Sequence, residues 1–202
     1  LMSTKKSFLS VFWNKTNILL PVYNNYKEAI DHDIDTVINL SSFRSAYETT
    51  LELIKIKKIK TIFIFAEGIP EKFSRHLRDE SIKNNKYLIG PSSIGGIRSG
   101  EIRIANTGGN LDNIFNLKLN ENRGNVGFVT RSGGLLNELA NIISFSSKGV
   151  REGVSIGGDR YSGTTFIDHI LRFEKDDKID YIILLGEVGG IEELIIADHV
   201  KF

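Results

Sequence analysis

Between residues 124 and 190, short apolar runs repeatedly lead into a pair of glycines. The three pieces read GNVGFVTRSGGLLNELANII, SIGGDRYSGTTFIDHIL and YIILLGEVGG. After the glycines, the first two continue with the apolar spacing of a helix face. A strand that turns through glycines into a helix gathers free backbone N–H groups at one point, where an anion can bind. This pattern predicts an α/β fold and indicates chemistry on phosphates or carboxylates.

The first 90 residues show the same alternation of strand and helix. We expect strands at 17–22, 36–40, 61–65 and 87–89, and helices at 26–30, 44–56 and 71–84. Such alternation is typical of a doubly wound parallel sheet. The polar stretch NLKLNENR at 116–123 is the best linker, so we predict one domain over 1–120 and a second over 121–202.

Composition limits the class of partner. The 202 residues are 41% hydrophobic and 25% charged, which is ordinary for a globular domain, and the net charge is +1. That charge gives no electrostatic reason to bind nucleic acid or an anionic membrane, and no apolar run reaches the roughly 18 residues of a membrane span. The chain has no cysteine, which excludes disulfides and fits a reducing cytosol. We therefore expect a cytoplasmic protein without a nucleic-acid or membrane partner.

The segment Thr130-Arg131-Ser132-Gly133-Gly134 is the strongest single site, and Ser132-Gly133-Gly134 forms its turn. The turn follows the apolar run NVGFVT and opens the helix-like segment LLNELANII. Ser132 suits the N-cap of that helix, and the two glycines allow a ligand to come close to its first turn. A plain N-cap with glycines for packing explains the motif about equally well. The spacing differs from that of a Walker A loop, so no nucleotide site is predicted.

Three charged side chains follow predicted strands. Glu187 in GEVGG and Glu67 in AEGIPE suit the orientation of a cationic or imidazole group, although an acidic residue near a helix N-terminus is the commoner explanation. Arg44 in NLSSFRSAY suits a contact with an anion, although a solvated surface arginine is the default. The four histidines do not cluster and show no metal-ligand spacing, so we expect no metal site.

Taken in order, the motifs resemble the ATP-citrate lyase family, within the succinyl-CoA synthetase superfamily. The likeness covers nearly the whole chain and rests on LPVYNNYKEAI, INLSSFRSAYETT, AEGIPE, IGPSSIGGIRSG, NTGGNLDNI, VTRSGGLLNELANIIS, EGVSIGGDRYSGTTFIDHILRFE and LGEVGGIEE. The segments RSAY, NTGGNLDNI and GGDRYSG favour the citrate-cleaving branch. A succinyl-CoA synthetase α chain stays open as an alternative, because both branches share the fold and the phosphohistidine chemistry.

The resemblance implies a fold and an activity. The fold would be a partial Rossmann-like CoA-binding domain followed by part of a flavodoxin-like ligase domain, both with parallel sheets. In the family, ATP phosphorylates a histidine, which passes the phosphoryl group to citrate. CoA then displaces phosphate, and citryl-CoA is cleaved to acetyl-CoA and oxaloacetate. The helix that opens at Ser132 would stabilise the phosphohistidine through its first-turn amides, and the same turn would contact citrate.

The resemblance also implies roles for particular residues. Glu67 and Glu187 match the glutamates beside the phosphorylated histidine, and we predict them as catalytic residues. The positions that match substrate and phosphate binding are Ser132, Gly133, Gly134 and Asn137. The positions that match the lining of the CoA site are Leu40, Ser42, Arg44, Phe65 and Ala66.

The chain also departs from the family pattern. It contains neither the GHAGA-like motif that carries the phosphorylated histidine nor the first glycine-rich CoA loop. The ATP-grasp and citrate-synthase-like regions are missing as well. We therefore expect a fragment, split subunit or truncated product that binds citrate and CoA, joins those domains or subunits in an oligomer, and leaves ATP and Mg to them. The isolated chain would be inactive, and a non-catalytic scaffold role stays open.

Overall fold

The computed structural model describes residues 8–13, 16–30 and 32–200, in two compact units, Leu1–Asp35 and Thr36–Phe202. The first unit holds β1 (Phe8–Trp13), β2 (Thr16–Pro21) and the short helix α1 (Tyr26–Ile30). The strand expected at 17–22 is present as β2. It pairs antiparallel with β1, however, instead of joining a parallel sheet. The sequence pattern did not predict the pairing of β2 with β1, because the residues of a strand do not determine which strand lies beside it.

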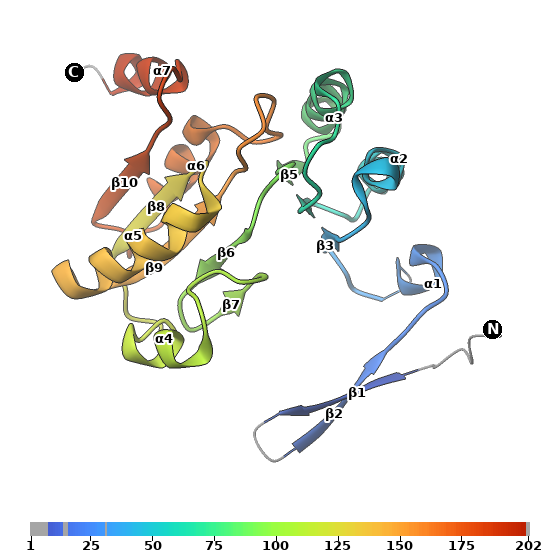
Figure 1. The fold of residues 1–202 in the computed structure, drawn as a ribbon, viewed down its shortest axis with the longest axis horizontal. Helices are drawn as coiled ribbons and strands as arrows, with labels where there is room; N and C mark the ends of the chain where they lie inside the picture. The colour runs from blue at the N-terminus through green and yellow to red at the C-terminus, as the bar shows by residue number, and fades with distance from the viewer. Residues whose placement is uncertain (1–7, 14–15, 31, 201–202) are drawn as a thin grey trace. The chain divides into compact units, whose positions relative to one another are not determined.

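The second unit begins with a three-stranded parallel sheet in the order β3-β4-β5. Its strands are β3 (Thr36–Asn39), β4 (Thr61–Ile64) and β5 (Tyr87–Ile89), joined by α2 (Phe43–Ile54) and α3 (Glu71–Lys83). The two helices pack against each other beside the sheet (Figure 1). Their buried faces carry Ala46, Leu53 and Ile54 from α2 and Leu77 from α3. The predicted alternation of strand and helix is confirmed here.

A five-stranded mixed sheet follows, in the order β10-β8-β9-β6-β7 (Figure 1). Its strands are β6 (Gly95–Arg98), β7 (Ile102–Arg103), β8 (Val126–Thr130), β9 (Val150–Ser155) and β10 (Tyr181–Leu185). Its helices are α4 (Leu111–Asn116), α5 (Gly133–Ser146), α6 (Phe166–Phe173) and α7 (Glu192–His199). The predicted α/β class with parallel sheets is confirmed. Of the helices in the described residues, none is long and apolar enough to cross a membrane.

Strands β6 and β7 add an antiparallel edge that the sequence pattern did not predict. The two glycines of β6 resemble turn residues in the sequence. In the structure they allow the backbone of β6 to lie close to neighbouring backbone segments. A Cβ on Gly95 would lie 2.5 Å from the Ile104 carbonyl oxygen, and a Cβ on Gly96 would lie 3.0 Å from that of Gly153. Both strands precede residue 120 but share a sheet with β8, β9 and β10. The sheet therefore crosses the predicted domain boundary at 120/121, and that boundary stays a prediction.

Two hydrophobic clusters cover the two faces of this sheet. On one face Phe128 of β8 belongs with Leu136, Ala140 and Ile143 of α5, and on the other Val129 belongs with Phe166, Ile170 and Phe173 of α6. Successive residues of a strand point to opposite faces, so β8 is buried on both sides. The turn that follows β8 is therefore attached to a strand that packed side chains hold on both faces.

The chain after β5 joins the two sheets. The Gly90 amide donates to the Ile156 carbonyl at 3.2 Å, and the Gly90 carbonyl accepts from the Gly163 amide at 2.9 Å. Gly90 has a φ of +105°, and a Cβ there would overlap the Ile64 carbonyl oxygen, so only glycine fits. This crossing brings the carboxyl ends of β4 and β9 to the same region, which is where ligands bind in sheets of this kind.

Candidate functional site

The first turn of α5 carries the predicted Ser132-Gly133-Gly134 motif. Ser132 is the N-cap, and its Oγ accepts from the Leu135 amide at 3.4 Å. Gly133 packs on Ile94, because a Cβ there would overlap that side chain. Gly134 is exposed, and outside its own helical turn no atom of the described residues lies within 4 Å of its Cβ position. Capping and packing thus explain Ser132 and Gly133, whereas Gly134 leaves open space beside amides that have no acceptor within the helix.

Asn137 lies one turn into α5 and holds a neighbouring loop. Its Oδ1 accepts from the Gly108 amide at 2.7 Å, and its Nδ2 donates to the Asn106 carbonyl at 3.4 Å. The Arg103 guanidinium also donates to this loop, at the Gly109 carbonyl. The loop with the sequence NTGG (residues 106–109), called the NTGG loop below, is therefore held beside the first turn of α5. A direct substrate contact by Asn137 stays a prediction, since both ends of its amide are engaged by the loop.

Three acidic side chains follow strands β4, β9 and β10. Glu67 is exposed after β4, and Glu187 is 57% exposed after β10. Asp159 follows β9 in the GGDR loop (residues 157–160). The sequence pattern did not single out Asp159, although its position directly after a buried strand could have indicated it. Burial, and then the nearby charge of Glu67, raise the pKa of the Asp159 carboxyl. A carboxyl whose pKa is raised by burial and by a neighbouring charge is a common feature of functional sites.

Arg131 lies among these loops; the sequence placed it in the Thr130–Gly134 motif but gave its side chain no role. It directly follows β8, and its side chain is 11% exposed. Its guanidinium contacts Asp159 and Glu192, which are 28 and 61 positions away in the chain. No local pattern indicates contacts over such separations. These contacts of Arg131 become apparent only in the tertiary structure, where the segments that follow different strands lie together.

The residues matched to the CoA site lie together at the edge where β3 and β4 end. The Phe65 amide donates to the Asn39 carbonyl at 3.4 Å, which joins the two strand ends. The buried Asn39 side chain accepts from the Ser41 amide at 2.9 Å and shapes the turn into α2. Leu40 is 76% exposed and Arg44 is exposed as well, so this edge is open to a ligand. Ser42 is the N-cap residue of α2.

Ala66 and Glu67 connect the CoA edge to the second sheet. The Ala66 carbonyl accepts from the Ser92 amide at 3.0 Å, which fastens the AEG turn to the segment that joins the sheets. Glu67 lies close enough to Asp159 to raise the pKa of its carboxyl. The turn at Ala66 and Glu67 therefore lies beside the loop that follows β9. In the part of the chain that the structure describes, no three His, Cys, Asp or Glu side chains form a possible metal site.

Proteins of known family align with most of the chain. Residues 12–68 match the family model of the CoA binding domain, and residues 129–202 match that of CoA-ligase. The chain is 49% identical to a probable ATP-citrate synthase subunit 1 of Neurospora crassa, over 95% of the chain and 29% of that protein. It is 46% identical to the ATP-citrate synthase of Homo sapiens, over 94% of the chain and 17% of that protein. The chain belongs to the ATP-citrate synthase family.

Solved structures agree with membership of the ATP-citrate synthase family. The structure of ATP citrate lyase from Methanothrix soehngenii, in complex with citrate and coenzyme A, has a TM-score of 0.93 and 43% identity, covering 98% of this chain and 32% of that one. An acetyl-coenzyme A synthetase from Ca. Korarchaeum cryptofilum has a TM-score of 0.69 at 16% identity and shows the fold alone. The resemblance drawn from the motifs is confirmed. The chain spans about a third or less of the length of these relatives.

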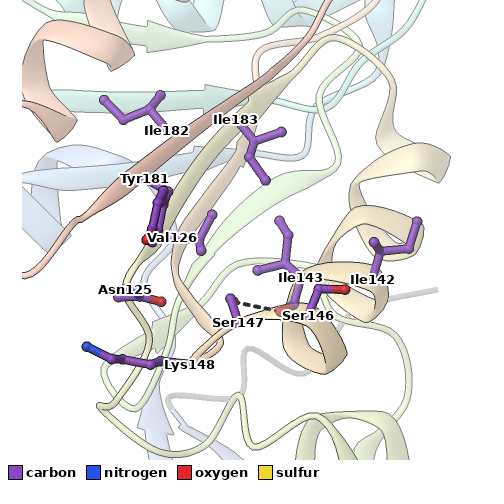
Figure 2. A pocket seen from close by; sticks show the side chains of 10 residues that line it. All are labelled: Asn125, Val126, Ile142, Ile143, Ser146, Ser147, Lys148, Tyr181, Ile182 and Ile183. Carbon is purple, nitrogen blue, oxygen red and sulfur yellow. Dashed lines mark hydrogen bonds between the residues drawn. The ribbon is translucent and has the colours of Figure 1, made fainter.

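A cavity of about 540 Å³ lies apart from the predicted site residues (Figure 2). Its lining comes from the end of α5, the start of β8 and most of β10, and includes Ile142, Ile143, Val126, Tyr181 and Ile183. None of the predicted site residues lines it. The cavity lies at the amino ends of β8 and β10, whereas the candidate site lies at the carboxyl ends of the strands.

Proposed function

We propose that this chain forms part of the CoA site and part of the citrate and phosphate site of an ATP-citrate synthase. The whole enzyme would form acetyl-CoA and oxaloacetate from citrate, CoA and ATP, through a phosphohistidine and citryl-CoA. The observation that carries the proposal is the open first turn of α5 at Gly134, at the end of a fully buried strand. Relatives at 41% to 49% identity named ATP-citrate synthase, and a solved relative with citrate and coenzyme A, support these ligands.

Each group at the α5 end of the site has its own task in this proposal. The first-turn amides at Gly133 and Gly134, aided by the helix dipole, bind a carboxylate of citrate or a phosphoryl group. Glu67 and Glu187 orient the imidazole that carries the phosphoryl group. The GHAGA-like motif is not among these 202 residues, so that histidine would come from another segment or subunit.

The edge formed by β3 and β4 takes the CoA. Arg44 is exposed and placed to pair with a CoA phosphate, because guanidinium groups bind phosphate oxygens through two parallel hydrogen bonds. Leu40 and Phe65 offer apolar surface, and Ser42 and Ala66 complete the edge. When bound, CoA supplies the thiol that accepts the citryl group.

Other parts of the enzyme would supply the remaining chemistry. ATP and Mg would bind an ATP-grasp domain or subunit, and citryl-CoA would be cleaved in a citrate-synthase-like domain. An oligomer would bring these sites together. We place the protein in the cytoplasm, and the absence of cysteine from the sequence supports this placement.

Calorimetric titration of the purified chain with citrate tests the α5 site, with Gly134→Asp as the probe. The new carboxylate would enter open space without a clash and repel an anion at the helix N-terminus. We expect citrate affinity to fall by about tenfold or more, which corresponds to about 1.4 kcal/mol. Gly134→Asn is the matched control, since it adds nearly the same volume without charge. Gly133→Asp is a poorer probe, because its side chain would collide with Ile94.

Unchanged citrate affinity in Gly134→Asp would contradict the α5 site. A folded wild-type chain that binds neither citrate nor CoA would contradict the whole proposal and favour a scaffold role.

Titration with CoA tests the other edge through Arg44→Ala. We expect CoA affinity to fall about tenfold with citrate affinity unchanged, because Arg44 lies at the β3–β4 edge and not at α5. Arg123→Ala removes another exposed arginine and serves as the control. Equal loss of both ligands in Arg44→Ala would count against a CoA-specific role.

A further inference from the structure

The side chain of Arg131 links three loops of the candidate site. It lies between β8 and Ser132 in the chain, and it is only 11% exposed. Its Nη1 donates to the Asp159 carbonyl at 3.0 Å, and its Nη2 donates to Glu192 Oε1 at 2.7 Å. Its Nε lies 4.0 Å from Glu187 Oε2. One planar group therefore contacts the GGDR loop, α7 and the GEVGG turn at once.

Helix α7 passes this contact on to the GEVGG turn. Its first residue, Glu192, holds Arg131, while the next, Glu193, accepts from the Glu187 amide at 3.1 Å. The turn wraps closely around Glu193, since a Cβ on Gly186 would overlap its carboxylate. The two glutamates are adjacent in one helical turn. The ion pair with Arg131 therefore also sets the position of Glu187.

The surroundings of Arg131 fit a structural anchor better than a ligand contact. Both Nη atoms already donate to protein groups. The guanidinium carbon lies 5.6 Å from the centre of the Phe166 ring, and the second oxygen of Glu192 accepts from the Phe166 amide at 3.4 Å. The Arg131 carbonyl accepts from Ser155 Oγ at 3.3 Å, so the backbone is held too. A charge this far from water persists only with a fixed partner, and Glu192 is that partner.

We propose that Arg131 is a positioning residue that holds Glu187 and the Asp159 loop in place relative to the first turn of α5, without touching the substrate. The inference rests on the proposed function, because it assigns Arg131 to the citrate and phosphate site. A lysine would keep the charge but carries a single nitrogen, so it cannot hold Asp159 and Glu192 in one rigid fork. Arg131→Lys therefore separates the geometry from the charge.

The test compares Arg131→Lys with Arg151→Lys in the purified chain. Arg151 is 4% exposed and pairs with Asp176 and Glu101 near the amino end of β9, the end opposite the site. It controls for the loss of a buried arginine as such. Three quantities are measured for each variant: amide hydrogen exchange over residues 157–160 and 186–190, the NMR chemical shift of the Glu187 backbone amide, and citrate affinity by calorimetry.

We expect Arg131→Lys to speed exchange in both loops about tenfold, to move the NMR resonance of the Glu187 backbone amide that donates to Glu193, and to weaken citrate binding about tenfold. Arg151→Lys should leave exchange and citrate affinity within about twofold and the Glu187 amide resonance unmoved. Equal effects of the two variants, or unchanged exchange and an unchanged Glu187 amide resonance in Arg131→Lys, would overturn the positioning role. A wild-type chain that binds no citrate would contradict the proposed function instead, while exchange and the Glu187 amide resonance would still decide the role of Arg131.

Discussion

His169 shows how burial changes the chemistry of a single residue. Its side chain is 1% exposed in the core beside α6. Arg172 Nη2 donates to its Nδ1 at 3.2 Å, so Nε2 carries the proton and donates to Thr164 Oγ1 at 3.0 Å. Burial, reinforced by the charge of Arg172, lowers the pKa of His169 to about 3. The imidazole is therefore a neutral part of the core at physiological pH.

This burial predicts how stability depends on pH. The folded pKa lies below the unfolded value of about 6.5, so the unfolded chain binds the proton and stability falls as the pH drops below about 6.5. Between pH 7 and pH 5 we expect the free energy of unfolding to lose about 2 kcal/mol through His169. His169→Gln keeps a neutral hydrogen-bonding side chain and should lose this component. Urea unfolding at both pH values measures it, and an identical pH dependence in variant and wild type would contradict it.

At the scale of elements, α5 and the NTGG loop form one structure. The helix buries Leu136, Ala140 and Ile143 against the sheet, while Asn137, on another face, holds the loop. The spacing of the apolar residues was readable because it repeats locally along the helix. The bond from Gly108 to Asn137 was not readable, since it spans 29 positions. The family resemblance therefore implied a substrate contact for Asn137, which stays a prediction, and gave no sign of its hydrogen bonds to the loop.

Asn137→Ala tests this connection between helix and loop. Removing two hydrogen bonds should cost about 1–2 kcal/mol of unfolding free energy and speed exchange of the Gly108 amide. Asn141→Ala is the control, because Asn141 is exposed on the same helix and gains the same helix propensity from alanine. Similar stability and exchange in the two variants would show that Asn137 does not fix the loop.

At the scale of the whole second unit, the crossing after β5 decides which strand ends share a site. Gly90 bonds to Ile156 and Gly163, which belong to the second sheet and to the loop before α6. Gly157 also approaches this crossing, because a Cβ there would overlap the Pro91 carbonyl oxygen. These contacts bring the AEG turn after β4 (residues 66–68) next to the GGDR loop after β9. The turn that borders the CoA edge therefore lies beside a loop of the second sheet.

The sequence by itself determined the alternating strands and helices, the N-cap at Ser132 and the glycine turn after β8. Each of these depends on residues only a few positions apart, so periodicity and capping chemistry reveal them. The tertiary structure alone decided that β2 pairs with β1, that β6 and β7 extend the second sheet, and that Asp159 lies near Glu67. It also decided the contacts of Arg131. These features arise from packing between distant segments, and packing leaves no local period in the chain.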